Sequence, residues 1–389
     1  MPFLQNSKIA NKYRVALSTI TRWIEQAELG NNNLELGTSN NKLRIIDNQN
    51  NIAELERLAE KSRVYKPQAG LKEHTVDSYF YEVFTVSEQL ELFTDLKNKK
   101  QINLKYYYKN GGAELWNKDY FNSFGKIKDQ NQHLLDNSFE SIKYLIKNKS
   151  INIIDIGTGN GYPVKDLIEA IKPQNYIGLD ISPEMLDLAQ GNIKKWYPDL
   201  AIKTIVTDFE RTQPQQLLLS AKNNDSTNLI LLLGHTICNL STPISSLLNI
   251  RSGMLEDDIL VFTSSLDTIS NRSNLDYVKG IEGKDEYAWI PRLLGVDVEE
   301  CRLKLVYDGN SKRKVKSLVL DKDYKVNFTI DGIKYNVLLE RESELIRWQH
   351  YLFDIHELIN LVHQSGFEVK QISADQKGEN VLVICKAKY

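Results

Sequence analysis

The sequence is poor in cysteine, in net charge and in long apolar runs. Its three cysteines, Cys238, Cys301 and Cys385, are far apart and odd in number, which excludes a disulfide framework. A net charge of −2 over 389 residues argues against a protein that coats nucleic acid or an anionic membrane along its whole surface. No apolar run reaches the roughly 18–20 residues that span a bilayer, and the opening MPFLQNSK lacks the apolar core of a signal peptide. We therefore expect a cytoplasmic protein that is not attached to a membrane.

The six histidines are not spaced as metal ligands. None lies at ligand spacing from a cysteine or a carboxylate, so we expect no metal site. The remaining composition, 41% hydrophobic and 26% charged, is that of an ordinary globular protein. The chain is long enough for two or three domains with cores of their own.

Residues 1–66 carry the pattern of a small helical domain with a hairpin. SKIANKYRVALSTITRWIEQAELG predicts helix, turn, helix, with Ser18 as N-cap and an apolar face formed by Ile20, Trp23 and Ile24. Two short alternating runs, LEL and KLRII, are joined by GTSNN and followed by the helical pattern IAELERLAEKSR. This layout is that of a winged helix-turn-helix and resembles the small DNA-binding domains of the excisionase and MerR type.

The charge of this domain leaves two interpretations open. Residues 1–66 hold ten Lys and Arg against seven Asp and Glu, a net of +3. The candidate DNA-binding side chains on the second helix are Thr19, Thr21, Arg22 and Gln26. Glu25 and Glu28 lie on the same helix and would repel phosphate. The alternative is a domain for docking or dimerisation without DNA contact.

The rest of the chain divides by pattern. Residues 67–145 are rich in aromatic residues and helix formers. Toward the C-terminus apolar strand runs alternate with helical patterns, which predicts an α/β domain with a mostly parallel sheet. Residues 267–345 interrupt this alternation and contain a strong DG hairpin signal. We predict a sheet domain from residues 146–266 and 346–389, and a mixed α+β substrate lobe from residues 67–145 and 267–345.

A glycine-rich loop follows the first apolar strand of the predicted sheet domain. INIIDIGTGNGYPVKDLIEAI places Gly157, Gly159 and Gly161 between a buried-strand run and a helix. Glycines let the backbone turn sharply and approach a ligand without a side-chain clash. The helix N-terminus behind the loop supplies free N–H groups and a partial positive charge. Nucleotide, flavin and dehydrogenase sites share such a loop, so the following strands must decide between them.

The following strands end in residues suited to an adenosine. A second strand ends at Asp180, where an acid can accept both hydroxyls of a ribose. A third is followed by Asp208 and Phe209, which suit an adenine amino group and its ring. LILLLGHTICNL, residues 229–240, would then be strand four, and FEVKQISADQKGENVLVICKAKY a closing antiparallel hairpin.

In this order the features resemble S-adenosylmethionine-dependent methyltransferases with a Rossmann-like class I sheet. The resemblance implies S-adenosyl-L-methionine as cofactor and S-adenosyl-L-homocysteine as product. The cofactor-binding residues that it implies are Asp155, Gly157, Thr158, Gly159, Gly161, Asp180, Ile181, Asp208, Phe209 and Gly234.

Two classes of DNA methyltransferase lack their reactive signature here. Amino-directed DNA enzymes carry a D/N/S-P-P-Y/F sequence after strand four to hold a flipped base, and this chain has GHTICN. Cytosine C5 enzymes need a Pro-Cys nucleophile, whereas Cys238 follows Ile237 and is better explained as a small buried residue.

Segments that are far apart in the sequence resemble the histidine Nα-methyltransferases of ergothioneine biosynthesis. KYYYKNGGAELW, KDYFNS, TDFE and LGHTICN occur here in order. The family shows K-Y-x-Y-D-x-x-G-x-x-L-F, E-Y-Y, G-D-F-E and L-G-S-T-I-G-N. The likeness covers roughly residues 80–389 and leaves the N-terminal domain unexplained.

The resemblance also implies roles for particular residues. It places Asn239 at the amino or carboxyl group of the substrate amino acid, and Tyr120 in the tyrosine pair that lines the pocket. The substrate-binding residues that it implies are Tyr108, Tyr120, Phe121, Asn239, Tyr277, Gln349 and Tyr351. The catalytic candidates are His235, Asn239 and Tyr120, with His235 acting either as a base or as a polar lining residue.

Departures from the family motifs point away from histidine as the substrate. Gln349 and Tyr351 occupy the places of an acid and a serine that hold the imidazole in the family. His235 and Cys238 replace the serine and the glycine of L-G-S-T-I-G-N. We therefore predict an N-methyltransferase that acts on a different amino acid or small amine.

Two other functions stay open at this point. One is a DNA-binding regulator whose methyltransferase-like part senses a ligand, and the other is a nucleic-acid-directed methyltransferase delivered by the N-terminal domain. The expected partners are a small amine or amino-acid substrate and, through the N-terminal domain, DNA or a protein.

Overall fold

A computed structural model describes most of the chain. The described residues are 3–13, 17–39, 42–64, 73–122, 132–146, 149–212, 215–221, 226–273, 277–280 and 286–388. The chain forms two compact units, Met1–Lys72 and Glu73–Tyr389, and each is described by itself. Within the described residues, no helix is long and apolar enough to cross a membrane.

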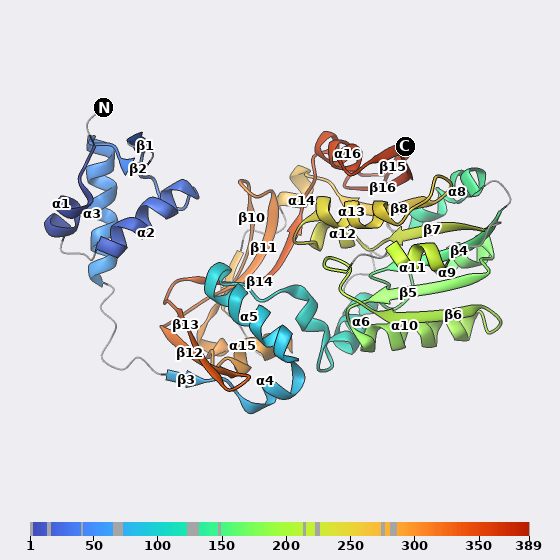
Figure 1. The fold of residues 1–389 in the computed structure, drawn as a ribbon, viewed down its shortest axis with the longest axis horizontal. Coiled ribbons are helices and arrows are strands. Elements are labelled where there is room, and N and C mark those ends of the chain that lie inside the picture. Colours follow the sequence, from blue (N-terminus) through green and yellow to red (C-terminus); the bar gives the residue numbers. More distant parts are fainter. Residues whose placement is uncertain are drawn as a thin grey trace. The chain divides into compact units, whose positions relative to one another are not determined.

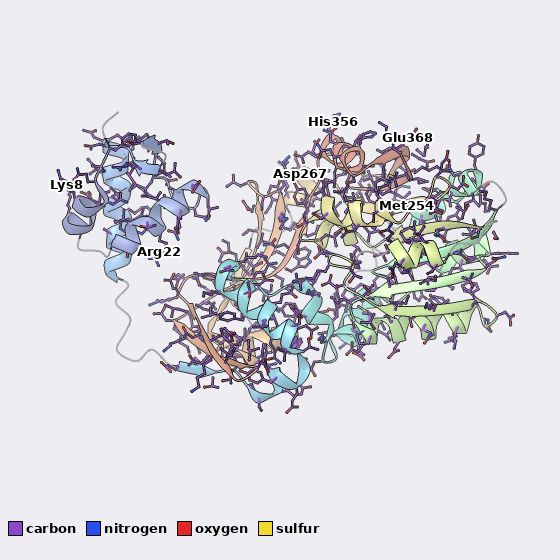
Figure 2. The ribbon with its side chains drawn as sticks, viewed as in Figure 1. Lys8, Arg22, Met254, Asp267, His356 and Glu368 are labelled. Carbon is purple, nitrogen blue, oxygen red and sulfur yellow. The ribbon has the colours of Figure 1, made fainter. Side chains whose placement is uncertain are left out.

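The N-terminal unit consists of three helices and a hairpin. Its elements are α1 (Asn6–Tyr13), α2 (Leu17–Glu28), β1 (Leu36–Ser39), β2 (Lys42–Ile45) and α3 (Gln49–Val64) (Figure 1). Ile20 and Trp23 of α2 are buried against Leu55 of α3, which explains the helical spacing of these apolar residues. Thr21 and Arg22 lie on the exposed side of α2, where Figure 2 labels Arg22.

A seven-stranded sheet forms the centre of the second unit. Its strands are β4 (Ser150–Ile156), β5 (Asn175–Asp180), β6 (Ala201–Val206), β7 (Ser226–Leu232), β8 (Ile259–Ser265), β15 (Phe367–Ala374) and β16 (Asn380–Ala387). Their order is β15-β16-β8-β7-β4-β5-β6, and only the pairs that involve β16 are antiparallel. This mixed order, with the closing hairpin next to β8, is the Rossmann-like class I methyltransferase fold, as predicted.

Helices cover both faces of this sheet. They are α8 (Phe139–Ile146), α9 (Lys165–Ile171), α10 (Pro183–Trp196), α11 (Gln215–Ser220), α12 (Thr236–Asn239), α13 (Pro243–Ser252) and α16 (Ile355–Gln364). Successive residues of β4 point to opposite faces: Ile153 packs in a core with Leu167 of α9, and Ile154 in a core with Leu247 of α13. Both faces are therefore apolar, which is why the strands read as continuous hydrophobic runs.

A second lobe is built from two distant segments. From the first come β3 (Glu73–Thr75), α4 (Ser78–Val83), α5 (Val86–Lys99), η1 (Leu104–Tyr108) and α6 (Gly112–Asn122). The later elements are α14 (Ile269–Ser273), β9 (Tyr277–Gly280), η2 (Glu286–Ala288), α15 (Trp289–Leu293), η3 (Val298–Glu300), β10 (Arg302–Asp308), β11 (Arg313–Val319), β12 (Tyr324–Ile330), β13 (Ile333–Leu339) and β14 (Glu344–Tyr351).

Strand pairing and a shared core join the two segments. β3 pairs in parallel with β12, while β14, β11, β10 and β9 form a separate sheet. Phe80 and Tyr106 from the first segment pack in one core with Phe328 from the second. The β12–β13 turn places Asp331 and Gly332 at φ of 48° and 74°, the left-handed conformation that the DG signal predicts.

Candidate active site

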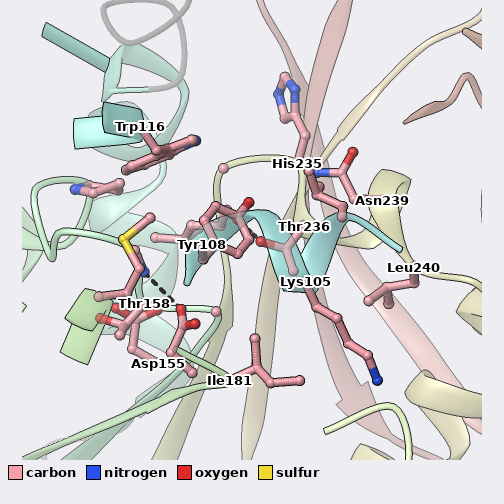
Figure 3. A pocket seen from close by; sticks show the side chains of 18 of the residues that line it. Lys105, Tyr108, Trp116, Asp155, Thr158, Ile181, His235, Thr236, Asn239 and Leu240 are labelled. Atoms are coloured by element: carbon pink, nitrogen blue, oxygen red, sulfur yellow. Dashed lines mark hydrogen bonds between the residues drawn. The ribbon is translucent and has the colours of Figure 1, made fainter. Parts of the chain in front are cut away.

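A cavity of about 330 Å³ opens at the carboxyl ends of the parallel strands. Its walls come from the loops after β4, β5, β6 and β7, and from η1, α6 and β14 of the lobe (Figure 3). β4 lies between β5 and β7, where the order of connection along the sheet reverses. Open α/β sheets bind their ligands in the crevice at this reversal.

The loop after β4 shows why its glycines are needed. Gly157 and Gly161 have φ of 69° and 71°, a left-handed conformation that side chains disfavour. A Cβ on Gly161 would lie 3.1 Å from the side chain of Ile193 in α10, so the loop is packed closely against that helix. The Gly157 N–H donates to the carbonyl of Leu179 at 2.8 Å and ties the loop to β5.

Two buried carboxyl groups stand at the strand ends beside this loop. Asp155 accepts a hydrogen bond of 2.7 Å from the Tyr176 hydroxyl, and burial raises its pKa to about 6. Asp180 accepts the N–H groups of Ser182 at 3.0 Å and of Gly159 at 3.3 Å, and burial likewise raises its pKa to about 6. Asp180 is thereby fixed at the place where a ribose is bound in folds of this kind.

An ion-pair network holds Asp208 after the third strand. The Lys105 ammonium of η1 lies 2.8 Å from Asp208 and 2.9 Å from Glu91 of α5, and Arg211 lies 2.8 Å from Glu91. These contacts connect the lobe to the sheet at the edge of the cavity. Phe209 also lines the cavity, so an acid and a ring are together where the sequence predicted an adenine site.

A hydrogen-bonded array of four side chains forms the opposite side. Ser265 Oγ lies 3.0 Å from Nδ1 of His235 and 3.0 Å from Nε2 of His350. His350 Nδ1 is 2.9 Å from Oδ1 of Asn239, so three strands or loops meet in one array. His235 is the N-cap of α12 with φ of 58°, and its N–H donates to Thr263 Oγ1 at 3.0 Å.

Both histidines are held in the neutral form. Burial, and then the positive charge of Lys314, lower the pKa of His235 to about 4. Burial is also the main cause that lowers the pKa of His350 well below its usual value. Nε2 of His235 is buried and has no hydrogen-bond partner among the described residues. Its ring is therefore a neutral imidazole with one nitrogen uncommitted.

Aromatic rings complete the walls. The Trp116 and Tyr120 rings stack with centroids 5.2 Å apart, and those of Trp348 and His350 stack at 5.4 Å. Tyr108 also lines the cavity, and burial raises its pKa, so its hydroxyl stays protonated. Flat, electron-rich faces attract cationic groups such as an ammonium or a sulfonium.

Most of the predicted site residues line this cavity. They are Tyr108, Tyr120, Asp155, Gly157, Thr158, Gly159, Asp180, Ile181, Asp208, Phe209, Gly234, His235 and Asn239. Gly161 does not line it and instead packs against α10. Tyr277 is the first residue of β9, and its side chain lies outside the described part of the structure.

Three predicted substrate-binding residues do not line this cavity. Phe121 is 43% exposed and packs edge-on against Tyr120 and Tyr162, outside the cavity. Tyr351 lies against Phe353 and Arg313, and Gln349 lines only a neighbouring pocket. The positions of Gln349 and Tyr351 follow from the alternation of side chains along β14. Because Trp348 and His350 face the cavity, the residues next to them do not.

Sequence reasoning missed Trp348, His350, Trp116 and Lys105 as lining residues. Trp116 and Lys105 lie within the quoted KYYYKNGGAELW motif, so the signal was present but assigned to its tyrosines. On β14, alternate residues of W-Q-H-Y lie on opposite faces of the strand, and the sequence fits either face as the one that lines the cavity. The packing of the lobe decides which face does so. Ser265, which connects the two histidines, had no signal beyond its place at a strand end.

Comparison with known proteins now identifies the chemistry. Residues 87–276 match a family model described as "Histidine-specific methyltransferase, SAM-dependent". The chain is an S-adenosylmethionine-dependent methyltransferase. The match includes the glycine loop, the three strand-end acids and the GHTICN segment of this methyltransferase, and its cofactor is S-adenosyl-L-methionine. No curated protein matches the sequence of the methyltransferase.

Several solved structures are similar to the methyltransferase at low identity. An S-adenosylmethionine-dependent methyltransferase from Clostridium acetobutylicum is 10% identical, with 71% of this chain and 100% of that chain covered and a TM-score of 0.45. The sugar N-methyltransferase KedS8 from Streptoalloteichus sp is 10% identical, with 71% and 92% covered and a TM-score of 0.41. Magnesium protoporphyrin IX methyltransferase from Synechocystis PCC 6803, with bound SAH, is 10% identical, with 73% and 98% covered and a TM-score of 0.42.

Proposed function

We propose that the methyltransferase transfers a methyl group to the amine nitrogen of an amino acid or related small amine, and that histidine is not its substrate. The observation that carries this proposal is the array of Asn239, His350, Ser265 and His235 on the side of the cavity opposite the strand-end acids. It supplies neutral hydrogen-bonding groups next to aromatic walls. Such a surface suits an amine that must arrive without its proton.

The acids of the cavity support the exclusion of histidine. Asp155, Asp180, Asp208 and Glu210 are the carboxylates that line it in the described part of the chain, and all belong to β4, β5 and the loop after β6. Among the described residues, the substrate side therefore offers no carboxylate to accept the N–H of an imidazole. An imidazole would meet the Trp116, Tyr120 and Trp348 rings instead.

The hydrogen bonds of the array support one assignment of the imidazole protons. With the Asn239 oxygen toward His350, Nδ1–H of His350 donates to Asn239, and its Nε2 accepts the Ser265 hydroxyl. Ser265 Oγ then accepts Nδ1–H of His235, which leaves the lone pair on Nε2 of His235. Asn239 is thereby fixed in orientation, while Nε2 of His235 is buried and the ring supports the cavity wall as a neutral polar group.

The transfer itself needs little covalent help from the protein. The cofactor supplies an electrophilic methyl group: the N–CH₃ bond forms as the S–CH₃ bond breaks, and the electron pair stays on sulfur. The chain contributes by holding the amine in line in a water-poor cavity, which is where most of the rate gain of such displacements arises. The amine proton passes to solvent.

A mass-resolved assay tests this proposal. The protein is incubated with methyl-labelled S-adenosylmethionine and a panel of amino acids and small amines that includes histidine. We expect the label on the nitrogen of at least one non-histidine substrate and little on histidine. Cofactor binding without any methylated product would refute it and favour a ligand-sensing role, while preferential labelling of histidine would refute the exclusion.

We further propose that the N-terminal unit binds DNA through α2. The order helix, helix, hairpin, helix and the exposure of Thr21 and Arg22 on α2 support this role. Thr19 and Gln26 are partly buried on the same helix, and Glu25 is exposed there. Gel-shift binding should weaken steeply with salt and be lost in Arg22→Ala. Salt-insensitive self-association without a shift would instead indicate a docking domain.

A further inference from the structure

A second pocket of about 190 Å³ adjoins the cavity of the candidate active site. Asn103, Leu104, Asn239, Leu240 and Trp348 line both hollows, so the two lie side by side. Asn239 belongs to the hydrogen-bonded array, and it therefore stands where a substrate held by that array would pass from one hollow into the other. The proposed function leaves the second pocket without an occupant.

The charged side chains that line this pocket have a net positive charge. Lys99 and Asp95, both in its lining, pair with each other at 3.0 Å. Arg313 lines it too and has no carboxylate partner within the described part of the chain. Its Nη1 donates to Oε1 of Gln349 at 2.5 Å, and its guanidinium carbon lies 5.6 Å from the centre of the Tyr351 ring. One positive charge is left over.

The remaining donors of Arg313 fit one kind of ligand. A guanidinium carries five N–H donors, and a single Gln349 oxygen takes one of them. Planar guanidinium groups bind carboxylates with two parallel hydrogen bonds, which is stronger than contact with a neutral acceptor. The Tyr351 ring and the Gln349 amide hold the guanidinium in place before a ligand arrives.

We propose that this pocket binds the side-chain carboxylate of an acidic amino acid whose α-amine is methylated in the adjoining cavity. The proposal rests on the proposed function and adds the substrate class to it. Asn239 and His350 would hold the backbone end of the substrate, and Arg313 its acidic end. A protonated imidazole would be repelled by Arg313, which agrees with histidine not being the substrate.

Matched pairs of amino acids test the proposal. Aspartate, glutamate and 2-aminoadipate are compared with asparagine, glutamine and norleucine, which have similar length but no side-chain charge. We expect at least one of the acids to be methylated with a kcat/KM on the order of 10²-fold above its neutral counterpart, as charged hydrogen bonds to a fixed guanidinium allow. Equal or better methylation of the neutral set would overturn the assignment.

Substitution of Arg313 separates the side-chain carboxylate from the α-carboxylate. Arg313→Gln should lower kcat/KM for the acidic substrate on the order of 10²-fold and leave the neutral amino acids within about threefold. Arg313→Lys keeps the charge and should retain part of the activity. Arg341, 59% exposed in the β13–β14 turn, gives the matched control Arg341→Gln, which should change neither. Equal losses for acidic and neutral substrates would place the α-carboxylate at Arg313 and refute the proposal.

A binding measurement distinguishes failure of this proposal from failure of the proposed function. Calorimetric titration of aspartate, glutamate, 2-aminoadipate and glutamine into the protein saturated with S-adenosylhomocysteine requires no turnover. Glutamate that binds, loses its affinity in Arg313→Gln, and is never methylated would support the pocket and refute the methylation. An absence of binding by all three acids, alongside methylation of other amines, would refute the pocket alone.

Discussion

The two sides of the active-site cavity are built in different ways. The cofactor side comes from short stretches that follow consecutive strands, so that Asp155, Asp180 and Asp208 each sit at a strand end within 60 residues of one another. The substrate side brings together Tyr108, Asn239, Ser265 and His350, which span more than half of the chain. The first depends on local backbone geometry, whereas the second depends on how the lobe packs.

This difference predicts different failures when each side is altered. Changes on the cofactor side should weaken cofactor binding, whatever the substrate. Changes on the substrate side should leave cofactor binding intact and affect turnover or selectivity. The following expectations test that separation, beginning with the largest.

Substitution of His235 should have the largest effect on turnover. His235→Gln keeps a polar group of similar length but loses the Nδ1 contact of 3.0 Å to Ser265, and we expect kcat to fall on the order of 10²-fold because the array that orients Asn239 is disturbed. The S-adenosylhomocysteine affinity measured by calorimetry should stay within about threefold. A kcat within fivefold of wild type would show that His235 does not position the substrate side, and a loss of cofactor affinity would contradict the separation of the two sides.

Substitution of Asp180, which lines the cavity at the end of β5, should affect the cofactor side. In Asp180→Ala, we expect S-adenosylhomocysteine to bind on the order of 10²-fold more weakly, because charge-assisted hydrogen bonds to the ribose are lost. Asp187 is exposed on the following helix α10, and Asp187→Ala is the control that should bind normally. Unchanged cofactor affinity in Asp180→Ala would show that Asp180 does not hold the ligand.

Lowering the pH should reduce the free energy of unfolding through the buried, neutral His235. The folded-state pKa of His235 is lowered to about 4 from 6.5, so the unfolded chain takes up a proton first as the pH falls. This group therefore destabilises the fold progressively from pH 6.5 down to about 4, by up to about 3 kcal/mol. Asp155 and Asp180, with pKa values raised to about 6, act in the opposite direction.

Comparison with a variant isolates the histidine from those two acids. Urea unfolding of wild type and His235→Gln should show a stability difference that moves in favour of the variant between pH 7 and pH 4.5. A difference that is independent of pH over this range would mean that the imidazole is accessible to protons in the folded state.

Substitution of two adjacent aromatic residues should have the smallest effect, and it distinguishes a ring that lines the cavity from one that does not. Tyr120 lines the cavity, whereas Phe121 packs outside it. Tyr120→Ser should raise KM for the amine by about tenfold through loss of an aromatic wall. Phe121→Ser should leave kcat/KM within about twofold. Equal effects of the two substitutions would show that the ring positions, as placed by the structure, do not decide substrate binding.

Much of the cofactor side could be predicted from the sequence because its information is local. A left-handed backbone at Gly157 requires glycine, and an acid directly after an apolar run must stand at a strand end. Gly161 was the exception: its absent side chain serves packing against Ile193 of α10, which a motif alone does not distinguish from ligand contact.

The substrate side could be predicted only where a motif carried it, as for Asn239 and Tyr108. Alternate residues of W-Q-H-Y on β14 point to opposite faces of the strand, and the sequence does not indicate which face lines the cavity. The motif position selected Gln349 and Tyr351, which point away from the cavity. Which face points inward depends on the pairing of β14 with β11 and on the packing of the lobe, contacts made between residues far apart in the chain.

By itself, then, the sequence determined the class I sheet, the glycine loop and the acids at its strand ends, because hydrophobic runs and strained turns act over a few residues. The tertiary structure alone decided that His350 and Ser265 connect His235 to Asn239, and that Arg313 lines a pocket beside them. Side-chain direction along a strand is set by which face the rest of the fold buries, and no short stretch of sequence contains that information.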